Sequence, residues 1–290
     1  MNSVDRVLTF DCAGETLVGV ITVPDRPRDT AVLVIVGGPQ YRVGSHRHFV
    51  LLARALASRG YPVLRFDYRG MGDSAGATRT FEEATDDIHA AIDALLATQG
   101  QPRRVVLWGL CDGASAALLY WHAKRDNRVA GMCLLNPWLR SGVSLARTQI
   151  KHYYRQRLMQ PAFWLKLLHG GMALGALKGL LDNLATAIHR RQPDSADAID
   201  FRTAMAHAWR AFPGPLLLVL SGSDYTAKEF MEGASNDEAW RGALSRTGVE
   251  RVEVTTADHT FSASADRLRR ESAVLEWLDA QFAEPALAKG

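Results

Sequence analysis

Two patterns of hydrophobic positions alternate along most of the chain. Continuous runs of aliphatic and β-branched residues indicate strands that are buried on both faces. These runs cover residues 31–36, 62–66, 105–110, 129–135, 215–220 and 252–254. Segments 49–59, 82–97 and 114–124 have helical spacing, and the first two end near glycine or proline. With an antiparallel pair at 7–10 and 17–23, the pattern predicts an α/β fold whose eight-stranded, mostly parallel, doubly wound sheet has helices on both faces.

The alternation stops after Pro137. Residues 138–212 hold no strand-like run, and a leucine-rich stretch from Phe163 to Leu184 has the character of apolar helices. We therefore expect residues 1–137 and 213–290 to form the core, with 138–212 inserted as a helical lid that covers the site and determines the substrate.

The insertion holds 11 Lys and Arg but 4 Asp and Glu, although the net charge of the chain is only +3. Two interpretations stay open. The charges can form a solvated helical face, or they can meet an anionic or lipid-linked substrate, or a membrane surface.

Composition narrows the function class. The chain has 290 residues, of which 47% are hydrophobic and 22% charged, as in soluble globular proteins. A net charge of +3 does not favour nucleic acid. Cys12, Cys111 and Cys133 have neither disulfide nor metal-ligand spacing, so we expect no metal and no cofactor. No signal peptide or membrane-spanning run is evident, which predicts a cytoplasmic protein. The oligomeric state stays open.

The segment Gly109-Leu110-Cys111-Asp112-Gly113 is the most informative one. It joins a buried strand to a helix, and glycine stands two places on either side of Cys111. Such spacing is typical of a sharp turn that presents a nucleophile at a helix N-terminus. An ordinary buried thiol at a strand end would be the alternative. The setting favours the nucleophile.

A cysteine nucleophile needs a base and an acid that orients the base. Asp224 follows the strand at 215–220, and His259 follows the strand at 252–254. Both therefore lie at carboxyl ends of parallel strands, where such folds gather their chemistry. Asp258 could compete as the acid, but it is too close in sequence to reach the imidazole easily. The predicted triad is Cys111, Asp224 and His259.

An acyl intermediate also needs an oxyanion hole. The N–H groups of Asp112 and Gly38 are the expected donors, since Pro39 has none. Gln40, Tyr41 and Arg42 follow this turn and are candidate substrate-binding residues. The basic residues of the loop that follows this turn form either a solvated surface or a clamp for a phosphate or carboxylate on the substrate.

With these motifs in place, the chain resembles the α/β-hydrolase superfamily over nearly its whole length. The segment Asp67-Tyr68-Arg69-Gly70-Met71-Gly72-Asp73-Ser74 resembles a loop of that superfamily in which Asp67 and Arg69 would brace the site. Segments 36–47 and 109–113 are similar to the first hydrolase encoded beside exosortase A systems. Cysteine in place of serine departs from most members.

These features predict cleavage of an ester, thioester or lactone of a small-molecule acyl substrate through a thioacyl-enzyme. Transfer of the acyl group to an acceptor other than water is the alternative, because a thioester is a good acyl donor. A binding protein that has lost catalysis is a third hypothesis, against which the complete triad counts.

Overall fold

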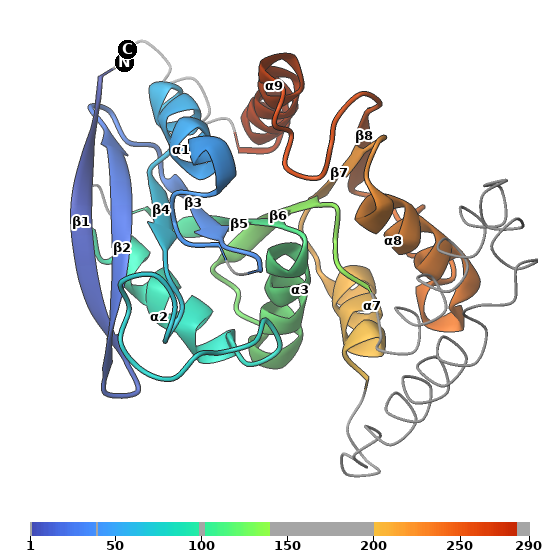
Figure 1. The fold of residues 1–290 in the computed structure, drawn as a ribbon, viewed down its shortest axis with the longest axis horizontal. Helices are drawn as coiled ribbons and strands as arrows, with labels where there is room; N and C mark the ends of the chain where they lie inside the picture. The colour runs from blue at the N-terminus through green and yellow to red at the C-terminus, as the bar shows by residue number, and fades with distance from the viewer. Residues whose placement is uncertain (1, 39, 99–101, 140–199, 283–290) are drawn as a thin grey trace, which may run out of the picture. The chain divides into compact units, whose positions relative to one another are not determined.

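Eight strands form a single mixed sheet in the computed structural model, which describes residues 2–38, 40–98, 102–139 and 200–282 (Figure 1). The strand order is β1-β2-β4-β3-β5-β6-β7-β8. β1 pairs antiparallel with β2 and β2 with β4, whereas all other neighbours are parallel. The strands are β1 Ser3–Cys12, β2 Glu15–Pro24, β3 Thr30–Ile35, β4 Val63–Phe66, β5 Arg104–Leu110, β6 Val129–Leu135, β7 Leu216–Ser221 and β8 Val249–Val254.

Helices cover both faces of this sheet (Figure 1). α1 and α9 lie on one face, and α2, α3, α7 and α8 contribute to the core on the other. The described helices are α1 His48–Ser58, α2 Thr85–Leu96, α3 Asp112–Lys124, α7 Phe201–Ala211, α8 Tyr225–Asn236 and α9 Ser264–Phe282, with short 3₁₀ helices η1 Ser45–Arg47 and η2 Glu238–Trp240.

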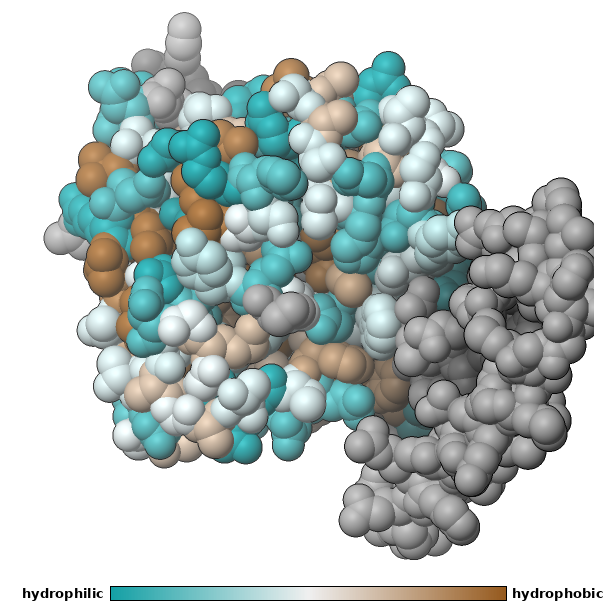
Figure 2. Space-filling view, viewed as in Figure 1, coloured by the Kyte–Doolittle hydropathy of each residue, from teal (hydrophilic) through white to brown (hydrophobic). Residues whose placement is uncertain are grey.

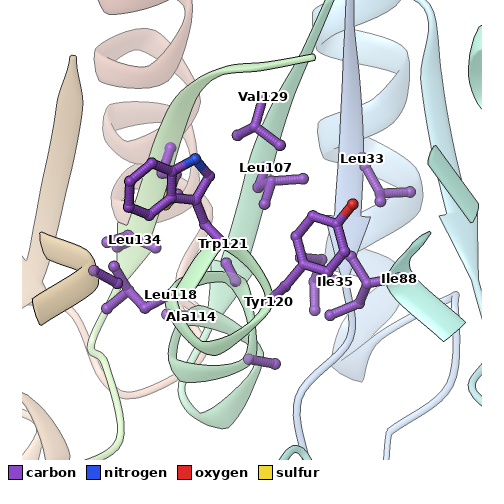
Figure 3. Packing of buried hydrophobic residues seen from close by; sticks show 14 of the residues in the cluster. Leu33, Ile35, Ile88, Leu107, Ala114, Leu118, Tyr120, Trp121, Val129 and Leu134 are labelled. Carbon is purple, nitrogen blue, oxygen red and sulfur yellow. The ribbon is translucent and has the colours of Figure 1, made fainter. Parts of the chain in front are cut away.

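The central strands β3, β5, β6 and β7 are apolar along most of their length because both of their faces are covered. Along β3, Leu33 and Ile35 face the cluster beneath α2 and α3, whereas Val32 and Val34 face the cluster beneath α1 and α9. Figure 3 shows the first cluster, in which the side chains of α3 lie over β3, β5 and β6. Burial on both faces thus explains the continuous apolar runs in the sequence.

The predicted doubly wound sheet is confirmed, and the differences lie at element ends. β1 begins at Ser3 rather than Val7 and continues to Cys12, because its whole length pairs with β2. β8 likewise begins at Val249 rather than Val252. Both are edge strands with one neighbour. An edge strand tolerates exposed polar residues, so the ends of β1 and β8 are not part of an apolar run in the sequence.

The predicted insertion at 138–212 lies mostly outside the described residues, as does its expected contact with substrate or membrane. Its last part is α7, which packs on α3 within the same compact unit as the sheet. Trp209 of α7 is fully buried, and its indole N–H donates to the carbonyl of Ala243 at 2.9 Å. None of the helices described here is long and apolar enough to cross a bilayer.

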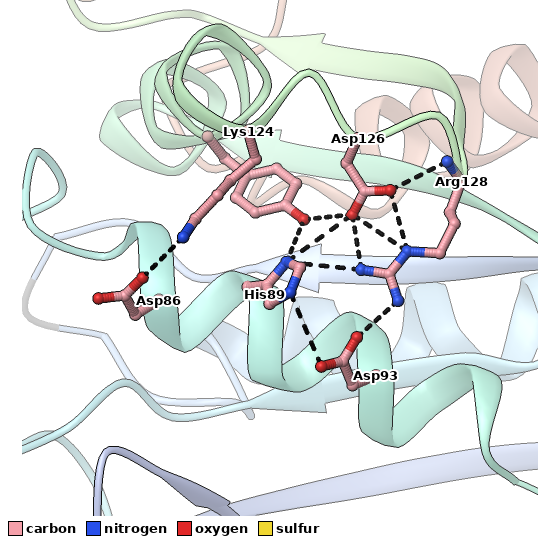
Figure 4. A network of polar contacts seen from close by, with 7 residues as sticks. Asp86, His89, Asp93, Lys124, Asp126 and Arg128 are labelled. Atoms are coloured by element: carbon pink, nitrogen blue, oxygen red, sulfur yellow. Dashed lines mark hydrogen bonds and ion pairs between the residues drawn. The ribbon is translucent and has the colours of Figure 1, made fainter.

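The visible surface mixes hydrophilic and hydrophobic residues, with apolar ones near the β1–β2 edge (Figure 2). A polar network ties α2 to the end of α3 and the start of β6 (Figure 4). Asp126 accepts hydrogen bonds from Tyr120 and Arg128, and Arg128 also pairs with Asp93. Burial works against the charge of Asp126, but these hydrogen bonds outweigh it and lower the pKa of Asp126 to about 2.

We predict that Asp126→Asn lowers the free energy of unfolding at pH 7 by about 2 kcal/mol. The folded-state pKa lies below the ordinary value of 3.8, so this stabilisation is present above about pH 4 and is lost as the pH falls toward 2. Urea unfolding from pH 7 to pH 3 measures it. Asp86→Asn is the matched control, since Asp86 pairs with Lys124 at an exposed position and should change stability little.

Candidate active site

Cys111 sits in a strained turn between β5 and α3. Its φ and ψ are 61° and −128°, a backbone conformation that residues with a side chain rarely adopt. The flanking glycines make this turn possible. A Cβ atom on Gly109 would clash with the carbonyl of Gly113, and one on Gly113 would clash with the carbonyl of Ile35. The glycine spacing noted in the sequence therefore reflects close backbone contact.

The turn also fixes the environment of the Cys111 thiol. The Cys111 N–H donates to the carbonyl of Leu135 at 2.9 Å, and its carbonyl accepts from the N–H of Trp138 at 3.2 Å. Cys111 is partly exposed, whereas Cys12 and Cys133 are buried. Burial raises the pKa of the Cys133 thiol, which suits an inert core residue.

His259 and Asp224 meet across the loops that follow β8 and β7. Nδ1 of His259 lies 2.8 Å from Oδ2 of Asp224. Asp224 also caps α8 by accepting from the N–H groups of Thr226 and Ala227 at 3.1 and 3.2 Å. Burial works against its charge, but the hydrogen bonds from His259 and the helix terminus prevail and lower the pKa of Asp224. The carboxylate is thus held in one orientation.

His259 links this carboxylate to Cys111. Hydrogen bonding to Asp224, followed by the interaction with the Cys111 side chain, raises the pKa of His259 to about 10, although burial acts in the opposite direction. The imidazole therefore retains a proton at neutral pH. A charged imidazole stabilises negative charge on a neighbouring sulfur. The structure thus brings together all three residues of the predicted triad.

Asp258 has a different role. Its carboxylate accepts from the backbone N–H groups of Thr260 and Ser262 at 3.1 and 2.9 Å. It shapes the loop that carries His259, while Asp224 is the carboxylate at Nδ1 of the imidazole. These contacts give the two carboxylates different partners.

Asn136 is a residue of the site that the sequence analysis did not single out. It is fully buried at the end of β6. Its side-chain N–H₂ donates to Ser221 Oγ at 2.8 Å and to the carbonyl of His259 at 3.3 Å, and its Oδ1 accepts from the Ser221 N–H at 2.9 Å. Asn136 thereby joins the ends of β6 and β7 to the histidine loop. A polar residue that ends an apolar run before Pro137 was the available signal.

The expected oxyanion donors also lie together. Gly37 packs so closely on the elbow that a Cβ atom there would clash with the Leu110 carbonyl and the Asp112 carboxylate. Gly38 follows with φ 61° and open space where a Cβ would stand. Gly38 and Asp112 line the same pocket, whose volume is about 630 Å³, a size typical of small-molecule sites.

The three candidate substrate-binding residues differ in their placement. Gln40 and Tyr41 line this pocket. Arg42 does not line it, because its guanidinium pairs with Asp67 and Asp73 in the loop after β4. Gly72 completes that loop, since a Cβ atom there would overlap the Asp67 carboxylate.

A buried cation lies behind the oxyanion loop. Arg270 of α9 is fully buried, and its Nη1 lies 3.3 Å from Nδ1 of His48. Burial, and then the charge of Arg270, lowers the pKa of His48 to about 3, so this imidazole is neutral. Because Arg270 can only donate, the proton of His48 sits on Nε2, which donates to Oε1 of Gln40 at 3.3 Å. The guanidinium also lies 5.5 Å from the ring of Phe261, close to His259 in sequence.

No cluster of three or more His, Cys, Asp and Glu that could hold a metal ion occurs in the part of the chain that the structure describes. The chemistry that the described arrangement supports is nucleophilic attack by sulfur with an imidazole as proton carrier.

Comparison with known proteins identifies the family of this chain. The chain is 31% identical over 211 residues to the quorum-quenching protein AidA of Acinetobacter baumannii, a match that covers 70% of this chain and 62% of that protein. It is 37% identical over 109 residues to the lysophosphatidylserine lipase ABHD12 of Xenopus tropicalis, covering 37% of this chain and 27% of that protein. The chain thus matches less than two thirds of the length of these relatives.

Solved structures share the fold. The esterase Pf2001 of Pyrococcus furiosus superposes with a TM-score of 0.64 at 16% identity, over 96% of this chain and 93% of that one. Est1E of Butyrivibrio proteoclasticus, solved with ferulic acid, gives 0.62 at 17% identity, over 96% and 100%. The model of the family described as "Alpha/beta hydrolase family" matches residues 32–271. The chain belongs to the alpha/beta hydrolase family.

Proposed function

We propose that this protein hydrolyses an ester, thioester or lactone through a thioacyl-enzyme on Cys111. One observation carries the proposal. Cys111 stands in the strained turn at the start of α3 and interacts with His259, whose other ring nitrogen is held 2.8 Å from Asp224. Nucleophile, base and orienting acid are thus connected in the order that acyl transfer requires.

The first half-reaction acylates the enzyme. In the reactive pair the proton of the Cys111 thiol already resides on Nε2 of His259, and the thiolate sulfur attacks the carbonyl carbon. The N–H groups of Gly38 and Asp112, which face the Asp112 carboxylate before substrate binds, then stabilise the oxyanion. When the tetrahedral intermediate collapses, the bond to the leaving oxygen or sulfur breaks, and that atom takes the proton from His259. A thioester on Cys111 remains.

The second half-reaction releases the acid. Water gives a proton to His259 as its oxygen attacks the thioester carbonyl, and the departing Cys111 sulfur regains that proton. An alcohol or amine in place of water would instead receive the acyl group. Both routes share the thioacyl-enzyme, so analysis of the products with and without an added alcohol separates hydrolysis from transfer.

The relatives support an ester-cleaving reaction. Their names include a lipase and esterases, and one relative is a quorum-quenching protein. Similarity of segments 36–47 and 109–113 to the first exosortase A-associated hydrolase adds a setting to the proposal, in which the enzyme serves exopolysaccharide production or protein sorting.

We predict that Cys111→Ala lowers kcat/KM on 4-nitrophenyl esters by at least about 10⁴-fold, because no acyl-enzyme can form. Its thermal unfolding should match that of the wild type. Cys12→Ala is the matched control and should retain activity, since Cys12 is buried in the core. Substantial turnover by the Cys111→Ala variant would show that the nucleophile is wrong.

Asp224→Asn should lower kcat by about 10³- to 10⁴-fold, because the imidazole loses its orienting carboxylate. Since Asp224 raises the pKa of His259, that pKa should fall in the variant, which an NMR titration of the imidazole measures. The control is Asp258→Asn, in which the carboxylate at Nδ1 is intact. Equal losses in both variants would contradict the assignment of Asp224.

Asn136→Ala should lower kcat by about 10- to 100-fold through misplacement of the histidine loop. Loss of its buried hydrogen bonds should also lower the free energy of unfolding by about 1–3 kcal/mol. Steady-state kinetics and urea unfolding measure the two effects. Asn236→Ala removes an exposed side chain that bonds only to the Glu232 carbonyl of its own helix, and it should alter neither. Unchanged kcat in Asn136→Ala would remove Asn136 from the site.

A further inference from the structure

The pocket beside the elbow has apolar walls and a polar base. It opens between the oxyanion loop and the loop that follows β4. Tyr41, Met71 and Phe81 are apolar lining residues, while Tyr68 and Asp112 are among the polar ones. Asp112 directly follows Cys111 in the chain. One end of the pocket therefore lies beside the turn that carries Cys111.

Two polar atoms at this pocket have no hydrogen-bond partner among the described residues. Tyr68 is only 3% exposed, and its hydroxyl is buried and unpartnered. Oδ1 of Asp112 is buried and unpartnered as well. Buried polar atoms are nearly always paired, because an unpaired one costs about 1–3 kcal/mol. A donor and an acceptor without a described partner, both on residues that line one pocket, indicate a ligand that completes both.

The protonation state of Tyr68 agrees with its role as a donor. Burial, and then the nearby Asp112 and Asp87, raises the pKa of Tyr68 well above its ordinary value, so the phenol stays a donor. Burial also raises the pKa of Asp112, and the backbone N–H groups of Gly38 and Gly113 oppose that shift.

The pocket wall that carries Tyr68 is firmly held. The next residue, Arg69, binds the fully buried Asp87 of α2 through its backbone N–H, Nε and Nη2 at 2.9–3.0 Å. A Cβ atom on Gly70 would clash with the backbone of Thr78, so the two sides of this loop are in close contact. The Tyr68 hydroxyl is thus positioned before any substrate binds.

A hydroxyl group satisfies both open atoms, because it accepts from the Tyr68 O–H and donates to Asp112 Oδ1. A carbonyl only accepts and an ammonium only donates. An anionic group is disfavoured, since the charged lining residues are Arg79, Glu82 and Asp112. Building on the proposed function, we infer that the pocket selects acyl groups that carry a hydroxyl near the carbonyl carbon, so that the substrates are hydroxyacyl esters or thioesters.

The chemistry assigns the pocket to the acyl side of the substrate. The leaving atom must take its proton from His259, which does not line this pocket, whereas the proposed oxyanion donors Gly38 and Asp112 do line it. The acyl chain points away from the leaving atom and is therefore the part that enters. Because Asp112 adjoins Cys111, the hydroxyl belongs on the second or third carbon of the chain.

A matched substrate pair tests the inference. We compare kcat/KM for 4-nitrophenyl 3-hydroxybutyrate and 4-nitrophenyl butyrate, with the 2-hydroxybutyrate ester as a third substrate. The wild type should prefer one hydroxyacyl ester by at least about tenfold. In Tyr68→Phe the ratio of the two kcat/KM values should fall to within about threefold of unity. The midpoint of thermal unfolding of this variant should not decrease, because the lost hydroxyl has no partner. Asp112→Ala should lose the preference in the same way.

Tyr61→Phe is the matched control. Tyr61 is equally buried, but its hydroxyl bonds to Arg28 and Asp279 away from the pocket, so the preference should persist. A wild type that cleaves both esters through Cys111 without preferring a hydroxyacyl group would overturn the inference and leave the proposed function standing. Equal preference in wild type and Tyr68→Phe would also overturn it. Full activity of Cys111→Ala would instead reject the proposed function.

Discussion

Close backbone contact at the elbow is the constraint on which the site depends. Cys111 keeps a strained conformation only because Gly109, Gly113 and Gly37 let neighbouring chain segments approach without a Cβ atom between them. The same contact brings the oxyanion loop against the start of α3. Cys111 and the proposed oxyanion donors Gly38 and Asp112 are therefore positioned by one packing arrangement, and a side chain at any of these glycines would separate them.

Around the elbow, buried polar residues hold the loops that carry the other candidate site residues. Asn136 joins the ends of β6 and β7 to the loop of His259, and Asp224 serves both α8 and the imidazole. On the opposite face of the sheet, Arg270 reaches the oxyanion loop through His48 and Gln40. Each loop at the site is thus tied to a regular element, which limits the movement of its backbone.

The fold and the positions of Cys111, Asp224 and His259 at strand ends were predictable because each signal is local. The apolar runs of β3 and β5 mark strands covered on both faces, and glycine spacing marks the elbow. Asn136, Arg270 and the partners of Arg42 gave no such signal, since their contacts join residues that lie far apart in the sequence. From the sequence alone Arg42 is interpreted as a surface cation, whereas in the structure it pairs with Asp67 and Asp73. Buried polar contacts of this kind depend on tertiary structure, which periodicity does not encode.

The distribution of the three thiols has a consequence for oxidative damage. Cys12 and Cys133 are buried in separate clusters on opposite faces of the sheet, whereas Cys111 is partly exposed. Peroxide therefore reaches Cys111 first, and neither of the other thiols is available to trap the resulting sulfenic acid as a disulfide. Recovery then depends on a small thiol supplied from outside the protein. Without one, oxidation proceeds to the sulfinic acid, and the damage becomes permanent.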